Sequence, residues 1–239
     1  MPRVGVIVHT LVSLFLLLCI MVVYFIPFLI MWLLPTRWLR NSRIFYWLMY
    51  SFYWILIKCS FLSIKITGEE NLPKEPAIIV ANHQSALDIP IVGSLLGADP
   101  QIWLATTFLK QSLIFRTVLP KFVVWVDMST PLKGVRSLVK VIKTVKETDQ
   151  HIVIFPEGAR FVDEKVHDFF AGFAILARKT GRPVVPVRLF NLYKVYPPNI
   201  FWIHRHPVRV VIGKPFYVKE GESNEHFRDR VHSWFVEQK

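Results

Sequence analysis

The sequence predicts an α/β fold that follows a membrane-embedded N-terminal segment. Residues 4–35 carry no charged side chain, as expected of a segment in contact with lipid. From residue 63 onward, short apolar runs alternate with helical stretches, which is typical of a sheet covered by helices. We therefore expect membrane-embedded or interfacial helices over residues 1–62 and a globular domain over residues 63–239.

The first apolar run is longer than a membrane span requires. It has 32 residues, and as a straight helix it would reach roughly 48 Å. A bilayer core is only about 30 Å thick. We expect Pro27 to kink or break this helix, because proline removes a helical hydrogen bond and crowds the preceding turn.

A basic stretch and then an aromatic stretch follow the first run. Arg37, Arg40 and Arg43 recur at a spacing of three, and seven of the ten residues in 45–54 are aromatic. A first helix that crossed the membrane would carry these arginines to the far side, which the positive-inside rule disfavours. We therefore favour a re-entrant or interfacial helix pair. Hydropathy leaves a two-span hairpin open as the alternative.

The net charge indicates which binding partners suit the chain, and the cysteine content indicates its redox compartment. The net charge is +12 and 53% of the residues are hydrophobic, which favours anionic lipid or a phosphorylated substrate. No zinc-finger or RNP-like motif indicates nucleic acid. The two cysteines, Cys19 and Cys59, are too few for a disulfide framework, which fits a reducing cytoplasmic body. We expect the protein at a bacterial inner membrane or its equivalent, with its functional site on the cytoplasmic face.

The pattern from residue 63 onward sets out the sheet and its helices in order. Short apolar runs predict strands at 63–67, 77–81, 102–106, 122–127, 151–155, 183–189 and 207–213. Apolar residues at helical spacing predict helices at 86–97, 107–116, 132–148, 169–180 and 224–237. Residues 190–206 mix aromatic and basic side chains, and we expect this segment to touch the membrane surface.

An imidazole and a carboxylate stand close together in "IIVANHQSALDIP", residues 78–90. His83 and Asp88 cannot meet on one regular element, because five residues turn a helix by about 140° net and reverse the face of a strand. They can meet where the strand ends in a turn and a helix begins near Ala86. The pair then suits a general base and its orienting carboxylate. The alternative is a structural histidine and a helix cap, since Ser85 and Asp88 resemble a capping box, and both roles can coexist.

A second apolar strand ends in a polar turn at "HIVIFPEGAR", residues 151–160. This turn presents Glu157, Gly158 and Arg160. Arginine suits bidentate binding of phosphate, and glycine lets a ligand approach the backbone closely. The alternative for Arg160 is a surface arginine paired with Glu157 or Glu164.

These blocks resemble those of the 1-acylglycerol-3-phosphate acyltransferase family, within the wider glycerolipid acyltransferases. "NHQSALD" matches the family's NHxxxxD motif, "FPEGAR" is similar to its FPEGTR block, and "VVPVRL" at 184–189 is similar to its VPV block. The three blocks follow the family's order, and the resemblance covers about residues 63–215. It implies a glycerol-phosphate acyltransferase-like fold, a mixed sheet flanked by helices, with residues 63–239 as the catalytic domain.

The resemblance also implies a reaction and its participants. An acyl chain would pass directly from acyl-CoA or acyl-carrier protein to the free sn-2 hydroxyl of lysophosphatidic acid, giving phosphatidic acid in phospholipid biosynthesis. His83 would act as general base and Asp88 would orient its ring. Glu157, Gly158 and Arg160 would bind the acceptor near its phosphate. The implied partners are a lysophospholipid, the acyl donor and the bilayer, with acyl-carrier protein as an alternative donor. No metal, cofactor or nucleic acid is expected.

The chain departs from the family pattern at two places. Ala159 stands where threonine is usual, and the family's second block is degenerate in "TTFLKQSLIFRTVLPKFVVWVDM". Lys110 is the candidate substrate-binding lysine of that block, unless the lysine is absent and Thr106 takes its place. These departures leave another lysolipid open as the acceptor. A non-catalytic membrane protein that binds acidic lipid is the other alternative, although such a protein needs no general base.

Overall fold

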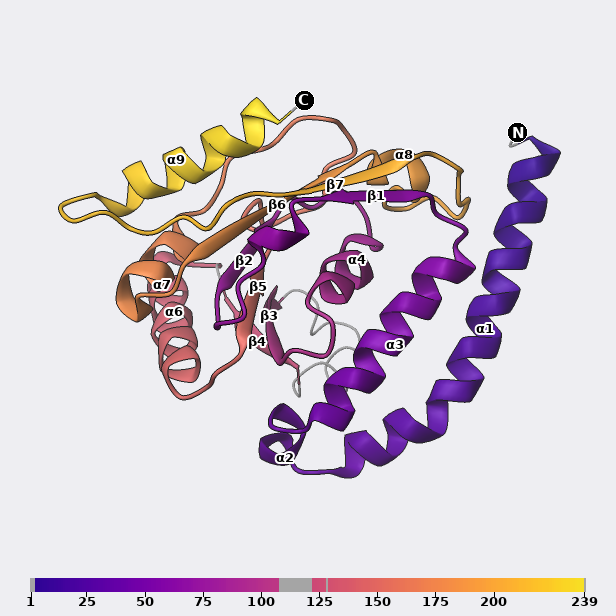
Figure 1. The fold of residues 1–239 in the computed structure, drawn as a ribbon, viewed down its shortest axis with the longest axis horizontal. Coiled ribbons are helices and arrows are strands. Elements are labelled where there is room, and N and C mark those ends of the chain that lie inside the picture. Colours follow the sequence, from indigo (N-terminus) through magenta and orange to yellow (C-terminus); the bar gives the residue numbers. More distant parts are fainter. Residues whose placement is uncertain (1–2, 108–121, 128, 239) are drawn as a thin grey trace.

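The computed structural model describes residues 3–107, 122–127 and 129–238. In this part of the chain, seven strands form one sheet in the order β1-β7-β6-β2-β5-β3-β4 (Figure 1). Their bounds are Ile64–Thr67 (β1), Ile78–Ala81 (β2), Gln101–Thr106 (β3), Val123–Val126 (β4), His151–Ile154 (β5), Val184–Phe190 (β6) and Val208–Ile212 (β7). Only the β6–β7 pairing is antiparallel among the described strands, so the expected mixed sheet is confirmed.

Helices cover both faces of the sheet, as Figure 1 shows. On one face lie α4 (Asp88–Leu95) and, outside it, α3 (Arg43–Cys59). On the other face lie α6 (Pro131–Lys146), α7 (Gly172–Thr180) and α9 (Asn224–Glu237). Because both faces are covered, the central strand β2 is apolar throughout rather than alternating, as is typical of buried parallel sheets.

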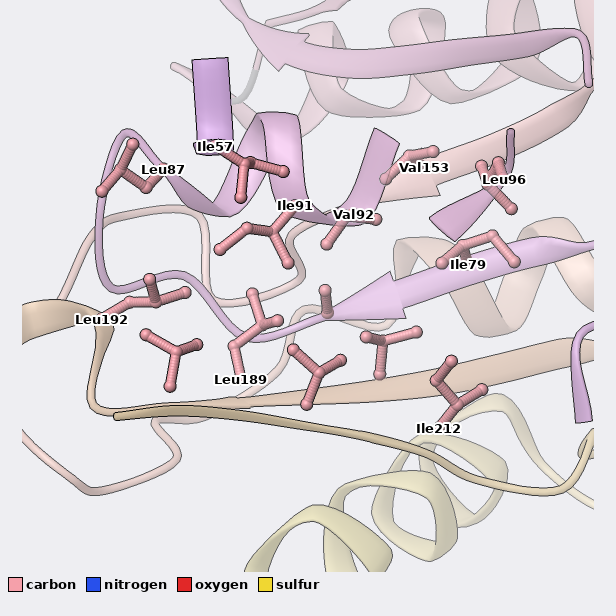
Figure 2. Packing of buried hydrophobic residues seen from close by; sticks show 14 of the residues in the cluster. Ile57, Ile79, Leu87, Ile91, Val92, Leu96, Val153, Leu189, Leu192 and Ile212 are labelled. Carbon is pink, nitrogen blue, oxygen red and sulfur yellow. The ribbon is translucent and has the colours of Figure 1, made fainter. Parts of the chain in front are cut away.

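The central strand β2 divides its side chains between the two layers. Ile79 packs against α4 with Ile91 and Val92 (Figure 2). Ile78 and Val80 pack toward the opposite helices. All four β2 residues are fully buried, and burial of one aliphatic side chain of this size contributes about 1.5–3 kcal/mol. This packing fixes the end of β2, where the polar residues of the first motif begin.

The N-terminal segment folds back on itself as a helical hairpin. It consists of α1 (Val4–Leu33), the short α2 (Thr36–Arg40) and α3. Tyr24 and Ser51 join α1 to α3 through a hydrogen bond of 2.9 Å, and the Tyr24 ring meets the edge of Phe52. Within the described residues, α1 is the one helix long and apolar enough to span a membrane, and only 11% of its most apolar window is buried. The structure thus confirms the apolar N-terminal helix, while the membrane embedding of α3 stays a prediction.

The globular domain contacts both ends of this hairpin. Near the start of α1, the backbone of Ile203 bonds to the His9 ring at 3.0 Å and to the Thr10 hydroxyl at 3.0 Å. At the opposite end, the Gln150 side chain donates to the Arg40 carbonyl at 2.5 Å and to the Tyr46 hydroxyl at 2.8 Å. The hairpin therefore runs alongside the body instead of projecting from it (Figure 1).

Several predicted boundaries need correction. The first helix does not break at Pro27: α1 is continuous through it and curves toward α2 in its last part (Figure 1). Helix α4 begins at Asp88 rather than near Ala86, because residues 82–87 form the turn that carries the motif. The short helices Glu69–Asn71 and α8 (Leu192–Val195) were not predicted, since three or four residues give little periodicity. The helix expected at 107–116 lies almost entirely outside the described residues.

Candidate active site

The two sequence motifs meet at the carboxyl ends of neighbouring parallel strands. β2 and β5 pair in parallel, with Val80 opposite Ile154, so the chain leaves both strands at the same edge of the sheet. His83 follows β2, and Glu157 follows β5. Crevices at the carboxyl ends of strands are where open α/β sheets place their ligands.

Asp88 holds the ring of His83 from the first position of α4. The carboxylate is fully buried, and its Oδ2 lies 2.6 Å from His83 Nδ1. The same oxygen accepts the backbone N–H groups of Gln84 at 2.5 Å and Ser85 at 2.8 Å. Because Oδ2 acts as the acceptor for all three groups, Nδ1 carries the ring proton and Nε2 of the neutral ring presents a lone pair. This is the arrangement of a general base and its orienting carboxylate.

The capping alternative is also partly correct. Asp88 accepts the Ser85 N–H, which is half of a capping box. The other half is missing, because the Ser85 hydroxyl accepts from Leu87 N at 3.2 Å and donates to the Tyr196 carbonyl at 2.6 Å. The carboxylate thus shapes the turn and orients the imidazole at once.

Two residues that sequence reasoning passed over hold His83 in place. The Asn82 side chain pairs with the backbone of Leu189 on β6, accepting its N–H at 2.7 Å and donating to its carbonyl at 3.0 Å. Phe155 stacks on the His83 ring, with centroids 4.0 Å apart and planes 10° apart. Asn82 and Phe155 directly follow the ends of β2 and β5, and this position could have marked them as candidate site residues. The neighbour that each one contacts depends on the strand order, which the sequence does not show.

Glu157 is buried and contacts the backbone of His83. It is 6% exposed, and its carboxylate accepts the backbone N–H of His83 at 2.9 Å and of His167 at 3.2 Å. Burial raises the pKa of Glu157 to about 7, while the two N–H groups act in the opposite direction. The carboxylate therefore joins the two motifs through the backbone of the base. Its expected role in binding the acceptor stays a prediction.

Arg188 is a buried cation whose charge interacts with the Glu157 carboxylate. It is 4% exposed on β6, and its Nη2 donates to the Glu164 carbonyl at 2.7 Å. Within the described residues, its Nε and Nη1 have no hydrogen-bond partner. Glu157 favours the charged form of Arg188, although burial, the larger effect, lowers the pKa of the guanidinium. The signal for Arg188 was a charged residue inside the otherwise apolar strand "VVPVRLF".

Gly158 and Arg160 follow Glu157 in the turn after β5. Gly158 has φ +71°, and a Cβ there would lie 2.7 Å from the Phe170 ring, so this position requires glycine. Arg160 is exposed, and its Nε donates to His83 Nε2 at 3.2 Å. The described structure therefore does not support pairing with Glu157 or Glu164 as the role of Arg160, since both carboxylates have other partners. Instead, the guanidinium lies beside the lone pair of the base.

The described residues include only part of the family's second sequence block, which spans residues 106–128. Lys110 lies outside the described residues. Thr106, the alternative to it, is the last residue of β3 and is exposed. The role of either residue in binding substrate stays a prediction.

An apolar cavity of about 200 Å³ adjoins the loop that carries His83. It lies between the hairpin of α1 and α3 and the start of α4, and residues of both contribute to its wall. The lining residues are Ser13, Leu14, Leu17, Leu56, Cys59, Ser60, Ala86, Leu87, Pro90, Tyr196 and Ile203.

Comparison with known proteins identifies the family. A family model described as Acyltransferase matches residues 63–189, which contain all three motifs.

The chain belongs to the acyltransferase family.

The chain is similar to several proteins named 1-acyl-sn-glycerol-3-phosphate acyltransferase. This chain is 30% identical over 199 residues to the protein of that name from Saccharomyces cerevisiae, and the match covers 74% of this chain and 64% of that protein. It is 32% identical over 168 residues to the protein of the same name from Borreliella burgdorferi, covering 66% of each. The chain thus spans about two thirds of the length of these curated relatives, and 46% of a chloroplast relative from Brassica napus.

A solved structure confirms the fold over the whole chain. The crystal structure of the 1-acyl-sn-glycerophosphate acyltransferase PlsC from Thermotoga maritima superposes with a TM-score of 0.79 at 26% identity. The superposition covers 100% of this chain and 98% of the other. The mixed sheet with flanking helices and the apolar N-terminal helix are thus the architecture of a PlsC-like acyltransferase.

Proposed function

We propose that this acyltransferase transfers an acyl chain from acyl-CoA or acyl-carrier protein to the sn-2 hydroxyl of lysophosphatidic acid, giving phosphatidic acid for phospholipid biosynthesis. The observation that carries this proposal is the contact of 3.2 Å between His83 Nε2 and Arg160 Nε. This contact supports the proposal because a guanidinium, which suits phosphate, lies next to an imidazole nitrogen that can accept a proton. Lysophosphatidic acid has the matching layout, because its free hydroxyl and its phosphate are on adjacent carbons.

The reaction follows from the tautomer that Asp88 imposes. With Nδ1 bonded to Asp88, His83 Nε2 takes the proton of the acceptor hydroxyl as its oxygen attacks the thioester carbonyl. A new ester bond forms, the carbon–sulfur bond breaks, and the imidazolium returns the proton to the leaving thiolate. Arg160 has to leave Nε2 before the hydroxyl can bind there. The acceptor phosphate attracts the guanidinium away from the ring and holds it in a charge-assisted contact.

The apolar cavity beside the loop supplies space for hydrocarbon. Its walls come from α1, α3 and the start of α4, so a substrate chain that lies in it is close to both the hairpin and the catalytic turn. An acyl chain that stays among apolar side chains avoids about 0.8 kcal/mol for each methylene exposed to water.

A direct assay tests the proposed reaction. The full chain is incubated with labelled acyl-CoA or acyl-carrier protein and with lysophosphatidic acid, and phosphatidic acid is quantified. A panel of other lysolipids with the same donor tests the acceptor. Efficient transfer to a lysolipid without a phosphate monoester, and none to lysophosphatidic acid, would contradict the proposed acceptor. Lipid binding without any transfer would indicate the non-catalytic alternative.

For the membrane, we propose that the hairpin inserts into one leaflet and keeps the active site on the cytoplasmic face. This proposal is supported by the contacts of the body with both ends of the hairpin, near Thr10 and near Arg40. If α1 crossed the bilayer, a body that touches both of its ends would have to enter the hydrocarbon, where its polar groups are unfavourable. Arg37 lies exposed at the far end of α1 and reports on this arrangement.

Cysteine labelling tests the arrangement. In a variant with Cys19 and Cys59 replaced by serine, Arg37→Cys is expected to react with a membrane-impermeant reagent applied from the cytoplasmic side. Labelling only from the opposite side would establish the two-span hairpin.

A further inference from the structure

A second cavity lies at the N-terminal end of the hairpin, away from the catalytic groups. Its volume is about 900 Å³, and it is formed by the start of α1, Phe61 after α3, and the loop 203–206. Figure 1 shows the N-terminal end of α1 on the same side of the molecule as α8, which precedes this loop. His83, Asp88 and Arg160 do not line it, so it is separate from the site described above.

The polar lining of this cavity is basic. The described residues that line it include no aspartate or glutamate, and the polar ones are Arg3, His9, His204, Arg205 and His206. His9 is 4% exposed; its Nδ1 bonds to the Ile203 carbonyl at 3.0 Å. Its Nε2 has no hydrogen-bond partner within the described residues. Because Nδ1 donates to the Ile203 carbonyl, Nε2 of the neutral ring is an acceptor. Buried polar groups in folded proteins are nearly always satisfied, so the unpaired Nε2 indicates a missing donor, such as a hydroxyl group of a ligand.

Apolar side chains surround the basic groups. Val8 is 54% exposed and Phe61 is 48% exposed, and both line the cavity. Phe61 has φ +51°, a left-handed backbone that phenylalanine rarely adopts, and its ring lies 5.9 Å from that of His9. Val4 at the start of α1 is 76% exposed, and Phe201, just before the loop 203–206, is 56% exposed. Basic groups within a margin of exposed apolar side chains are the pattern expected at the head-group level of a membrane.

We propose that this cavity binds the phosphate head group of an anionic bilayer phospholipid, separately from the acceptor in the active site. The arginines contact the phosphate, His9 Nε2 accepts a hydroxyl group of the head group, and Val8 and Phe61 contact the glycerol and the first methylenes. A neutral zwitterionic head group fits less well, because the described lining residues offer no carboxylate for its cationic part. The bound lipid holds the start of α1 and the loop 203–206 together at the membrane surface.

Binding to the detergent-solubilised full chain tests this proposal. The probes are dihexanoyl phosphatidylglycerol, dihexanoyl phosphatidylcholine and inorganic phosphate, with affinities measured by titration calorimetry or native mass spectrometry. We expect phosphatidylglycerol to bind at least about tenfold more tightly than the other two. The arginines repel the choline cation of phosphatidylcholine, and inorganic phosphate has no methylenes to contact Val8 and Phe61. Each such methylene contributes about 0.8 kcal/mol, so two of them correspond to about tenfold in affinity. Equal affinity for phosphatidylcholine would overturn the choice of an anionic lipid. Equal affinity for inorganic phosphate would show a phosphate site with no role for the lipid.

Matched variants locate the binding. Arg3→Gln combined with Arg205→Gln is expected to lower phosphatidylglycerol affinity at least about tenfold, whereas Arg205→Lys retains most of it. The control removes two exposed charges from α6, Arg136→Gln with Lys140→Gln, and leaves affinity unchanged. Arg160→Gln also leaves it unchanged, because Arg160 does not line this cavity. Wild-type affinity in the Arg3 and Arg205 variant, or lost binding in Arg160→Gln, would refute a separate site.

Discussion

At the scale of single residues, His83 lies between two groups that determine its chemistry. Asp88 bonds to Nδ1 at 2.6 Å, and Arg160 bonds to Nε2 at 3.2 Å. The contact with Asp88 puts a proton on Nδ1, and the contact with Arg160 requires Nε2 to be unprotonated, since a guanidinium only donates. The imidazole is therefore prepared to accept a proton as soon as the guanidinium moves to the acceptor phosphate.

We expect His83→Ala to lower the transfer rate by about 10²–10⁴, the usual contribution of a general base. The side chain is only partly buried, and the hydrogen bond from its backbone N–H to Glu157 does not depend on the imidazole. The thermal unfolding of the variant should therefore stay close to that of the wild type. Near wild-type turnover in the folded variant would remove His83 from the reaction.

Arg160→Ala is expected to raise the Michaelis constant for lysophosphatidic acid more than that for the acyl donor. A charge-assisted contact contributes about 1.5–3 kcal/mol, so the apparent affinity for the acceptor should fall at least about tenfold. Steady-state kinetics with each substrate varied in turn measure both constants. If neither the acceptor constant nor the rate changes, the contact with His83 has no role in catalysis.

Glu157 is expected to make stability depend on pH. Its pKa is raised from an ordinary value of 4.5 to about 7 by burial. Between these values the folded state binds more protons than the unfolded state, so the contribution of this carboxyl to stability declines as pH rises from 4.5 to about 7. Glu157→Gln lacks that decline, and its stability relative to the wild type should therefore increase across this interval. Thermal unfolding of both proteins from pH 4.5 to 7.5 measures it, and a constant difference would contradict the raised pKa.

At the scale of secondary-structure elements, the catalytic turn depends on how α4 packs. α4 carries Asp88 at its first position and lies between the sheet and α3. Its Gly93 faces Tyr53 of α3 so closely that a Cβ would lie 2.4 Å from the ring. Tyr53 is itself buried, with little room to move aside. The hairpin and the active-site helix are thus joined through one small residue.

We therefore expect Gly93→Ala to destabilise the protein by about 1–3 kcal/mol, the usual cost of overpacking. The displaced α4 should also lower activity, because it moves Asp88 relative to His83. Gly172→Ala at the start of α7 is the control, since no atom lies within 4 Å of its added Cβ. The test compares the melting temperature and the turnover of the two variants with those of the wild type. Equal behaviour of the two would show that Tyr53 accommodates the methyl group without moving α4.

At the scale of the whole molecule, α1 and α3 differ in their relation to the domain. Ile57 of α3 belongs to the core cluster that includes α4, whereas α1 is largely exposed. Removal of residues 1–62 would uncover that core, so a loss of activity would not separate folding from membrane contact. Removal of residues 1–34 leaves α3 in place and isolates the role of α1.

We expect the variant without residues 1–34 to lose much more activity on lysophosphatidic acid in a bilayer than on a short-chain, water-soluble lysolipid. Without α1 the substrate has to leave the bilayer, and each exposed methylene is unfavourable by about 0.8 kcal/mol. Two such groups already correspond to more than about tenfold in apparent affinity. Parallel assays with the two substrates test this, and equal losses on both would mean that α1 acts through folding alone.

The amino-acid pattern alone was enough to predict the seven strands, the longer described helices, the two polar turns and the uncharged N-terminal run. These features are local, because apolar periodicity and the residues at strand ends depend on near neighbours. It also indicates His83, Asp88 and Arg160 as candidate site residues, since their residue types and spacing lie within short stretches, while their roles stay a prediction.

Which of the two motifs' side chains contact each other depends on the three-dimensional fold. Arg160 reaches His83, and Glu157 supports its backbone, because β2 and β5 pair in parallel and in one register. Asn82 binds β6 and Arg188 lies behind Glu157 because β6 is the other neighbour of β2. The contacts of Ile203 with His9 and Thr10 join residues more than 190 positions apart. Such contacts depend on strand order and on the packing of buried side chains, which no local pattern in the sequence records.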